Sequence, residues 1–244
     1  MGDFVHLHIH SEFSLLDGAN RIKDLPVRAK ELGMDSIAIT DHGVMFGAID
    51  FYKACKANGV KPIIGCEVYV APRSRLDKDP SIDSKYNHLI LLAKNNEGYK
   101  NLSKLVSLSF VEGFYYKPRI DKEILEKYHE NLICCSACLA GEVNQAILKN
   151  DMEEAERVAL WYKNLFGEDY YLETKLGPTL YENDQAIGNT LKRLGVDYID
   201  VMILHHPVNN YIYAYKMLEK AYKEGKIKAI GLSNFQVAQI QEII

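Results

Sequence analysis

The stretch "VHLHIHSEFSLLDGANRIKDLPVRAKELGMDSIAITDHG", residues 5–43, has the pattern of one strand–helix–strand unit. Strand-like runs at residues 5–11 and 35–43 flank an amphipathic segment at 21–33, and Gly33 can close that helix in a left-handed turn. A helix between two strands is the usual connection between parallel strands of one sheet. The stretch therefore predicts an α/β fold.

The same alternation continues to the end of the chain. The predicted strands are 5–11, 35–43, 61–71, 88–94, 131–141, 170–176, 198–207 and 227–235. The predicted helices are 21–33, 45–59, 98–110, 142–151, 152–167, 181–195, 214–225 and 237–244. Residues 72–87 are polar and rich in turn residues, which predicts a surface loop. Eight strand–helix units predict a TIM-like (βα)8 barrel in which residues 1–244 form a single domain.

Composition limits the classes of function. The formal net charge of −4 and the lack of a long basic run argue against strong sequence-blind binding to duplex nucleic acid. No apolar run approaches the ~20 residues of a membrane span, and the start "MGDFVHLHIH" lacks the pattern of a secretory signal. We therefore expect a cytoplasmic protein, in which five cysteines point to core packing or metal ligation and not to disulfides.

Three histidines alternate in the first predicted strand: His6, His8 and His10. Alternate residues of a strand point the same way, so the three imidazoles share one face. Imidazoles buried in a core need partners, and a metal ion would supply one. The alternative interpretation is an exposed edge strand with solvated histidines.

Further polar residues follow the carboxyl ends of the predicted strands, where the catalytic residues of α/β barrels lie. They are Asp41 and His42, Glu67, and Cys138, whereas His88 opens its strand. Alone, "TDHG" is also explained by a capping turn and Glu67 by a surface salt bridge. Cys134 and Cys135 lie inside an apolar run and are predicted core residues. Together, imidazole, carboxylate and thiolate predict a site for zinc, or for manganese or iron.

Residues 4 to about 173 resemble the PHP (polymerase and histidinol phosphatase) domain of bacterial DNA polymerase III alpha subunits. The resemblance rests on "FVHLHIHSEFSLLDGA", "AITDHGVMFGAIDFYKA", "KPIIGCEVYVAPRS", "EGFYYKPRID" and "SACLAGEV". It implies a distorted seven-stranded barrel with a cluster of usually three metal ions. The family includes phosphoesterases and, in some polymerases, a metal-dependent 3′–5′ exonuclease.

The resemblance also implies a ligand set. One metal would be held by His8, His10 and Glu67, and Glu67 would bridge to a second ion held also by His88 and Cys138. Asp17 and His42 would belong to the third ion, while His6 stands where the family often has Asp. The late Asn-Asp-x-His-Tyr motif of the family, which completes the first and third sites, does not occur in this chain. We therefore expect only one or two tightly held ions.

From about residue 172 the chain resembles the aldo-keto reductases instead. The matching stretches are "TKLGPTLYENDQAIGNTLKRLGVDYIDVMILHHPV" and "KMLEKAYKEGKIKAIGLSNF". The resemblance implies a catalytic lysine at Lys175, a catalytic histidine at His205, and nicotinamide contacts from Ser233 and Asn234. The general-acid Tyr and the cofactor-phosphate units of that family are missing, so neither NADP binding nor reduction is expected.

These two resemblances meet at "YYLETKL", residues 170–176, so residues 1–173 and 174–244 look like parts of two barrels joined by engineering or recombination. The favoured hypothesis is a chimera that keeps a partial metal site. It would have at most weak phosphoesterase activity of the 3′–5′ exonuclease type, in which metal-bound hydroxide attacks a phosphoester or nucleotide. The alternatives are an inactive scaffold and, least favoured, an NADPH-dependent oxidoreductase remnant. His205 is either a replacement metal ligand or a rim histidine bonded to water.

Overall fold

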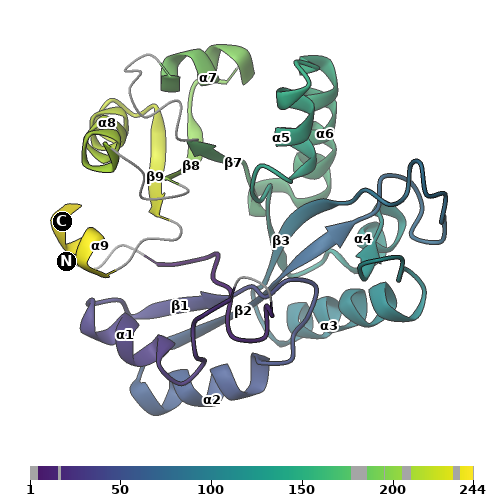
Figure 1. Ribbon diagram of the computed structural model, residues 1–244, viewed down its shortest axis with the longest axis horizontal. Helices are drawn as coiled ribbons and strands as arrows, with labels where there is room; N and C mark the ends of the chain where they lie inside the picture. The colour runs from purple at the N-terminus through teal and green to yellow at the C-terminus, as the bar shows by residue number, and fades with distance from the viewer. Residues whose placement is uncertain are drawn as a thin grey trace. The chain divides into compact units, whose positions relative to one another are not determined.

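The computed structural model describes residues 5–15, 18–176, 186–194, 196–204, 210–232 and 237–243. Within these residues the chain is a mixed α/β protein with one six-stranded and one three-stranded sheet (Figure 1). It divides into two compact units. The first comprises Met1–Cys135 and Tyr162–Tyr170, and the second comprises Ser136–Trp161 and Tyr171–Ile244.

The six-stranded sheet has the order β1-β2-β3-β5-β6, with β4 also paired to β2. Its strands are β1 (Ser36–Ile39), β2 (Lys61–Val70), β3 (Asn87–Ala93), β4 (Arg119–Ile120), β5 (Leu132–Cys135) and β6 (Tyr170–Tyr171). The expectation of parallel pairing is correct for β1 with β2 and wrong for β3, which runs antiparallel to both β2 and β5. The loop between β2 and β3 contains no helix, and a crossover helix is what a parallel return usually requires.

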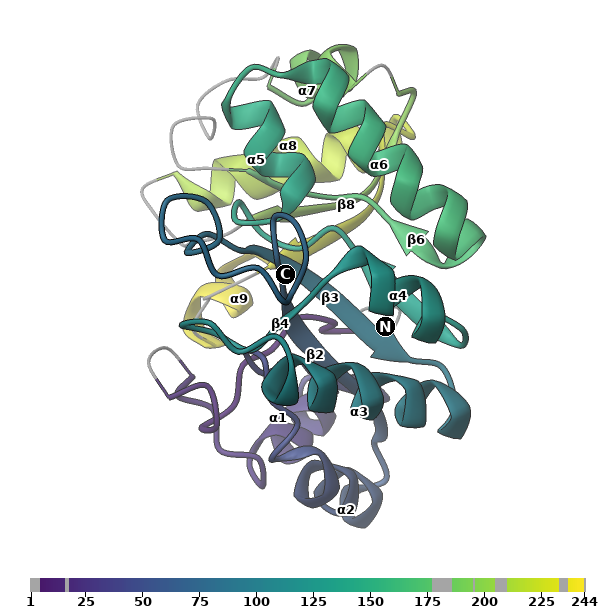
Figure 2. The ribbon, with the colours of Figure 1, turned by 90° about the vertical axis from the view of Figure 1, so that its right-hand side faces the viewer.

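Four helices belong to the first unit: α1 (Leu25–Glu31), α2 (Ala48–Asn58), α3 (Asn96–Val111) and α4 (Lys122–Tyr128). Helices α1 and α2 close a core that includes Ile22, Ile37, Phe51 and Cys55. Helix α3 runs along β2 and β3 (Figure 2). Gly33 has φ +75°, the left-handed turn expected after α1. Strand β4 and helix α4 were not predicted from the sequence.

The predicted first strand is not a regular strand. Residues 5–10 run beside β1, and their backbone carbonyls at His6 and Ile9 accept hydrogen bonds from Ala38 N (2.9 Å) and Thr40 N (2.8 Å). The Ile9 N–H donates to the Thr40 side-chain hydroxyl at 2.9 Å, where a regular ladder would use a backbone carbonyl. The segment is therefore docked on β1 without continuing the sheet.

The three-stranded sheet of the second unit is parallel, as predicted. It consists of β7 (Glu173–Leu176), β8 (Ile199–Leu204) and β9 (Ile227–Leu232). The other elements are α5 (Glu142–Leu148), α6 (Met152–Phe166, which ends in the first unit), the 3₁₀ turn η1 (Gly167–Asp169), α7 (Ala186–Leu194), α8 (Tyr211–Lys223) and α9 (Val237–Ile243). The core of this unit joins α7 and α8 to the sheet through Leu191, Met202 and Leu218.

The predicted strand 170–176 is divided at Leu172. Its first part, β6, belongs to the six-stranded sheet, and its second part, β7, pairs with β8. Ser136 lies beside the division: its N–H donates to Tyr171 O at 3.0 Å, and its hydroxyl accepts from Glu173 N at 2.8 Å. A closed eight-stranded barrel is thus not confirmed, because the described strands form two sheets and neither closes. That residues 1–244 form one domain stays a prediction.

In the described part of the chain, no helix combines the length and the apolar character that crossing a bilayer requires.

Candidate metal centre

Glu67, on β2, is the centre of a cluster of imidazoles. Its side chain is 1% exposed. Oε2 lies 3.4 Å from His8 Nε2, 3.2 Å from His10 Nε2 and 2.9 Å from His42 Nδ1, while Oε1 lies 2.8 Å from His88 Nδ1. One buried carboxylate therefore faces four imidazoles, all within the first unit.

The antiparallel turn of β3 explains why His88 joins this cluster although it opens its strand. Tyr69, near the carboxyl end of β2, pairs with His88 at the beginning of β3. In a parallel sheet the start of the next strand would lie at the opposite end of β2. His42 lies beside Glu67 because the pairing of β1 with β2 continues past the end of β1. Glu67 N donates to Asp41 O (3.1 Å), and Gly43 N donates to Glu67 O (2.9 Å).

A hydroxyl and a second buried carboxylate orient two of the histidines. Asp41 accepts hydrogen bonds from Ser11 N (2.6 Å) and from the hydroxyls of Ser11 and Ser14 (both 2.7 Å). Ser14 Oγ accepts from His42 N at 3.1 Å and lies 3.3 Å from His10 Nδ1. Because this hydroxyl gives its proton to Asp41, His10 Nδ1 is the donor in their contact. With the ring proton held on Nδ1, a bound metal ion would meet the lone pair of His10 Nε2, which lies near Glu67 and His8.

Sequence reasoning missed the roles of Ser11 and Ser14. The available signal was weak: Ser14 follows His10 by one helical turn, but the segment has no helical pattern. Asp41 was placed among the rim groups, whereas in the structure it organises the turn between His10 and Ser14.

Electrostatics keeps Glu67 ionised. Burial alone would raise its pKa, but hydrogen bonds from the four imidazoles outweigh burial and hold the pKa well below its usual range. His6 behaves differently, since burial lowers its pKa to about 4 and leaves the ring neutral near pH 7. The cluster thus offers one negative charge surrounded by ring nitrogens.

The donor atoms fit a divalent metal. His8 Nε2, His10 Nε2 and Glu67 Oε2 form a triangle with sides of 3.1, 3.4 and 3.2 Å. Ligands at about 2.0–2.1 Å from a tetrahedral zinc ion stand roughly 3.3 Å apart, so these three atoms match one face of the tetrahedron. A second group of donors, all within 4.8 Å of one another, comes from His42, Glu67 and His88. Glu67 belongs to both groups.

The described donors agree with the implied ligand set for His8, His10 and Glu67. His42 shares a donor group with Glu67 and His88, and its implied role beside Asp17 in a third site stays a prediction. Cys138 comes three residues after β5 and belongs to the second unit, and its Sγ accepts a hydrogen bond from Ala140 N at 3.4 Å. Its role as a metal ligand stays a prediction. Cys134 and Cys135 are buried on β5, as expected of core residues.

Several predicted site residues cannot be placed. Asp17, His205, Ser233 and Asn234 lie outside the described residues, as does the side chain of Lys175, whose backbone belongs to β7. The metal and reductase-type roles assigned to them stay predictions.

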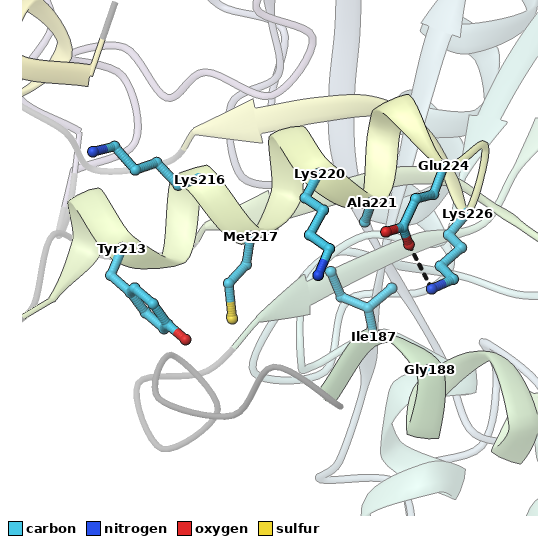
Figure 3. A pocket seen from close by; sticks show the side chains of 9 residues that line it. All are labelled: Ile187, Gly188, Tyr213, Lys216, Met217, Lys220, Ala221, Glu224 and Lys226. Carbon is cyan, nitrogen blue, oxygen red and sulfur yellow. Dashed lines mark hydrogen bonds and ion pairs between the residues drawn. The ribbon is translucent and has the colours of Figure 1, made fainter.

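A pocket in the second unit lies between α7 and α8 (Figure 3). Lys220 and Met217 reach into it from α8, and Ile187 reaches into it from α7, whereas the lining residue Lys216 points away from them. Lys226 is paired with Glu224 at 2.6 Å.

A buried carboxylate ringed by imidazoles at the end of an α/β sheet is the kind of arrangement found in metal-binding α/β proteins. The family model of the PHP domain matches residues 6–175, which is more than half of the chain, and the chain belongs to this family. PHP domains are typically metal-binding. The model of the aldo/keto reductase family matches residues 140–243, so the two matches overlap across the divided strand.

The curated relatives are DNA polymerase III alpha subunits. The subunit from Borreliella burgdorferi is 56% identical over 171 residues, which cover 70% of this chain and 15% of the relative. That from Aquifex aeolicus is 43% identical over 243 residues, covering 96% of this chain and 21% of the relative. The chain thus corresponds to about a fifth or less of the length of these relatives.

The similar solved structures are aldo-keto reductases. One from Brucella melitensis is 29% identical, with 40% of each chain covered and a TM-score of 0.35. The enzyme MGS-M4 from a deep-sea metagenome library is 37% identical, with 39% of this chain and 36% of the other covered and a TM-score of 0.33. TM-scores this low establish no common overall fold.

Proposed function

We propose that the chain is a metal-dependent phosphoesterase of the PHP type, with weak activity of the 3′–5′ exonuclease kind on phosphoester or nucleotide substrates. The observation that carries this proposal is Glu67, a buried and ionised carboxylate that faces four imidazoles. His8, His10 and Glu67 would hold one divalent ion, zinc or else manganese or iron, and His42, Glu67 and His88 a second.

A divalent ion in such a site lowers the pKa of bound water and polarises a phosphoryl oxygen. The chain's own residues supply the rest. Glu67 brings negative charge into a site built mainly of imidazole rings. Ser14 keeps the proton of His10 on Nδ1 and so directs the Nε2 lone pair inward. Asp41 holds Ser14 in place, so the orientation is set before substrate arrives.

We further propose that residues 1–173 and 174–244 come from two barrel families and were joined within residues 170–176, by engineering or recombination. Two family matches that overlap at residues 140–175 support this origin, as does the division of the join between two sheets. Under this proposal the missing late motif limits the site to one or two ions. The competing proposal is a folded scaffold without metal chemistry.

Metal analysis and a hydrolysis assay test the function together. Purified protein is loaded with zinc or manganese, dialysed extensively, and assayed by elemental analysis. It is then given a 3′-labelled single-stranded oligonucleotide and a nitrophenyl phosphodiester, with Glu67→Gln as control. We expect one or two ions per chain and slow hydrolysis that the control lacks. Bound metal without hydrolysis would leave the scaffold as the better description, and no bound metal would refute the metal centre itself.

A further inference from the structure

Lys117 carries a positive charge beside the candidate metal centre. Its side chain is half-buried, and its Nζ lies 5.4 Å from the centroid of the Tyr69 ring. Among the residues that the structure describes, no carboxylate lies within ion-pair distance of this ammonium group. A half-buried lysine keeps its ammonium accessible to water and needs no partner within the chain. Held over the Tyr69 ring, this charge is available to an anion from outside the chain.

The Tyr69 ring connects Lys117 to the cluster. Tyr69 follows Glu67 by two residues on β2, so both side chains lie on the same face of the sheet. Its ring centroid is 5.2 Å from that of His88, and it stacks on His42 at 6.1 Å with an angle of 9° between the planes. The Tyr69 ring thus contacts both the Lys117 ammonium and two of the candidate metal ligands.

The backbone around Lys117 is held in an unusual conformation. Tyr116 has φ +58°, which is uncommon for a residue with a side chain, and Tyr115 N donates to Lys117 O at 3.1 Å. A non-glycine residue in this region persists only where its surroundings enforce it, and such residues concentrate at functional sites.

Two packing contacts enforce this turn. Pro118 approaches Gly43 so closely that a Cβ on Gly43 would come within 3.0 Å of Pro118 Cγ and 2.8 Å of the Tyr69 ring. The buried guanidinium of Arg119 donates to Gly113 O at 3.1 Å and lies over the Tyr115 ring. The loop that carries His42 and the turn that carries Lys117 are thus packed against each other, which fixes the lysine relative to the cluster.

We propose that Lys117 and Tyr69 form an anion subsite of the metal centre that takes a non-bridging phosphate oxygen of the substrate. The proposal rests on the proposed function, because it names the residue that binds the phosphate beside the metal ligands. Lysine suits this role as a compact, strongly hydrated point charge. With Glu67 neutralised by divalent ions, the site as a whole would attract a phosphate group.

Inorganic phosphate is the probe for the test. Its binding to the full chain is measured by calorimetry, both metal-free and loaded with stoichiometric zinc, for the wild type and three variants. Lys117→Met removes the charge and Lys117→Arg keeps it. Lys104→Met removes an equally charged but exposed side chain from α3 and is the matched control. Zinc content is measured for every sample.

We expect Lys117→Met to weaken phosphate binding about tenfold at unchanged zinc content, as the loss of one partly exposed charged hydrogen bond implies. The phosphate affinities of Lys117→Arg and Lys104→Met should stay within about twofold of the wild-type affinity, which is a small change compared with the loss of one charged hydrogen bond. Equal phosphate affinity of Lys117→Met and wild type would overturn the subsite, as would wild-type protein that holds zinc and binds no phosphate. Failure of the wild type to hold zinc would count against the metal centre instead. The metal-free samples would then test the subsite: weaker phosphate binding by Lys117→Met than by the wild type would support it, and equal or undetectable binding by both would overturn it.

Discussion

Replacing Glu67 by glutamine is the most informative change to the candidate metal centre, because this one carboxylate belongs to both donor groups. The substitution keeps the shape of the side chain and removes its charge. Structural zinc bound by four ligands releases about 10–16 kcal/mol, so one ligand corresponds to roughly 3 kcal/mol, or on the order of a hundredfold in affinity. Glu67→Gln should therefore weaken every ion that the cluster holds by about that factor.

The histidines supply the comparison. His10→Ala removes a donor from one group only, and His88→Ala removes a donor from the other. Competition with a chromophoric chelator measures each affinity, elemental analysis counts ions, and circular dichroism shows that each variant is folded. We expect each histidine variant to weaken the binding of one ion, and Glu67→Gln to weaken the binding of every ion in the cluster. The loss of one ligand should lower zinc affinity by far more than about threefold. If the zinc affinity of Glu67→Gln is within about threefold of that of the wild type, Glu67 is a buried partner of the histidines and does not bind the metal.

Three further expectations follow from other parts of the chain. Arg119→Leu should lower the free energy of unfolding in urea by about 3 kcal/mol or more, since its buried guanidinium serves four backbone carbonyls that would lose their donors, whereas exposed Arg157→Leu should change it little. Burial raises the pKa of Cys55 from 9.0 to about 11, so the thiol of the unfolded chain ionises first and the free energy of unfolding should fall as pH rises from 9 to 11. Cys55→Ala should lessen that fall, and a pH profile of stability identical to that of the wild type would contradict the expectation. NADPH should not be oxidised in the presence of aldehydes, and substrate-dependent loss of its absorbance that disappears in Lys175→Ala would show otherwise.

The sequence was a good guide wherever local periodicity and local packing agree. The helix that ends at Gly33, the buried Cys134 and Cys135, and the parallel sheet of the second unit follow from patterns over a few residues. The meeting of His8 and Glu67 was also foreseeable, because polar residues at strand ends collect at one edge of a sheet.

The direction of β3 could not be read in the same way. Residues 72–86 appear in the sequence as a polar loop, yet they are fixed by ion pairs such as Arg73 with Asp83 (2.6 Å) and Arg75 with Asp121 (3.0 Å). The second of these pairs joins residues far apart in the chain. No periodicity reports such pairing, so the antiparallel return and the position of His88 had to come from the structure.

The prediction of one continuous strand over residues 170–176 was wrong for a different reason: the sequence pattern is continuous, but the strands that pair with it change along its length. Tyr170 and Tyr171 have the first sheet as neighbour, and Glu173 onward has β8. Strand propensity describes how well a segment fits a pleated surface and says nothing about which strand lies beside it. A join placed here keeps the local pattern of both families, which is why the sequence alone suggested one shared strand.

The proposed chemistry and the proposed chimeric origin are separate claims. Every donor of the two described groups lies between His8 and His88, whereas the reductase-like match begins at residue 140. The orienting residues Ser14 and Asp41 fall in the same early segment. Replacing the reductase-like part by a different sequence that keeps the first unit folded should therefore leave zinc affinity at these groups unchanged. If zinc affinity instead changed with the sequence of residues 174–244, this segment would have to supply a metal ligand. His205, which lies in "ILHHP", would then be the first residue to replace by alanine.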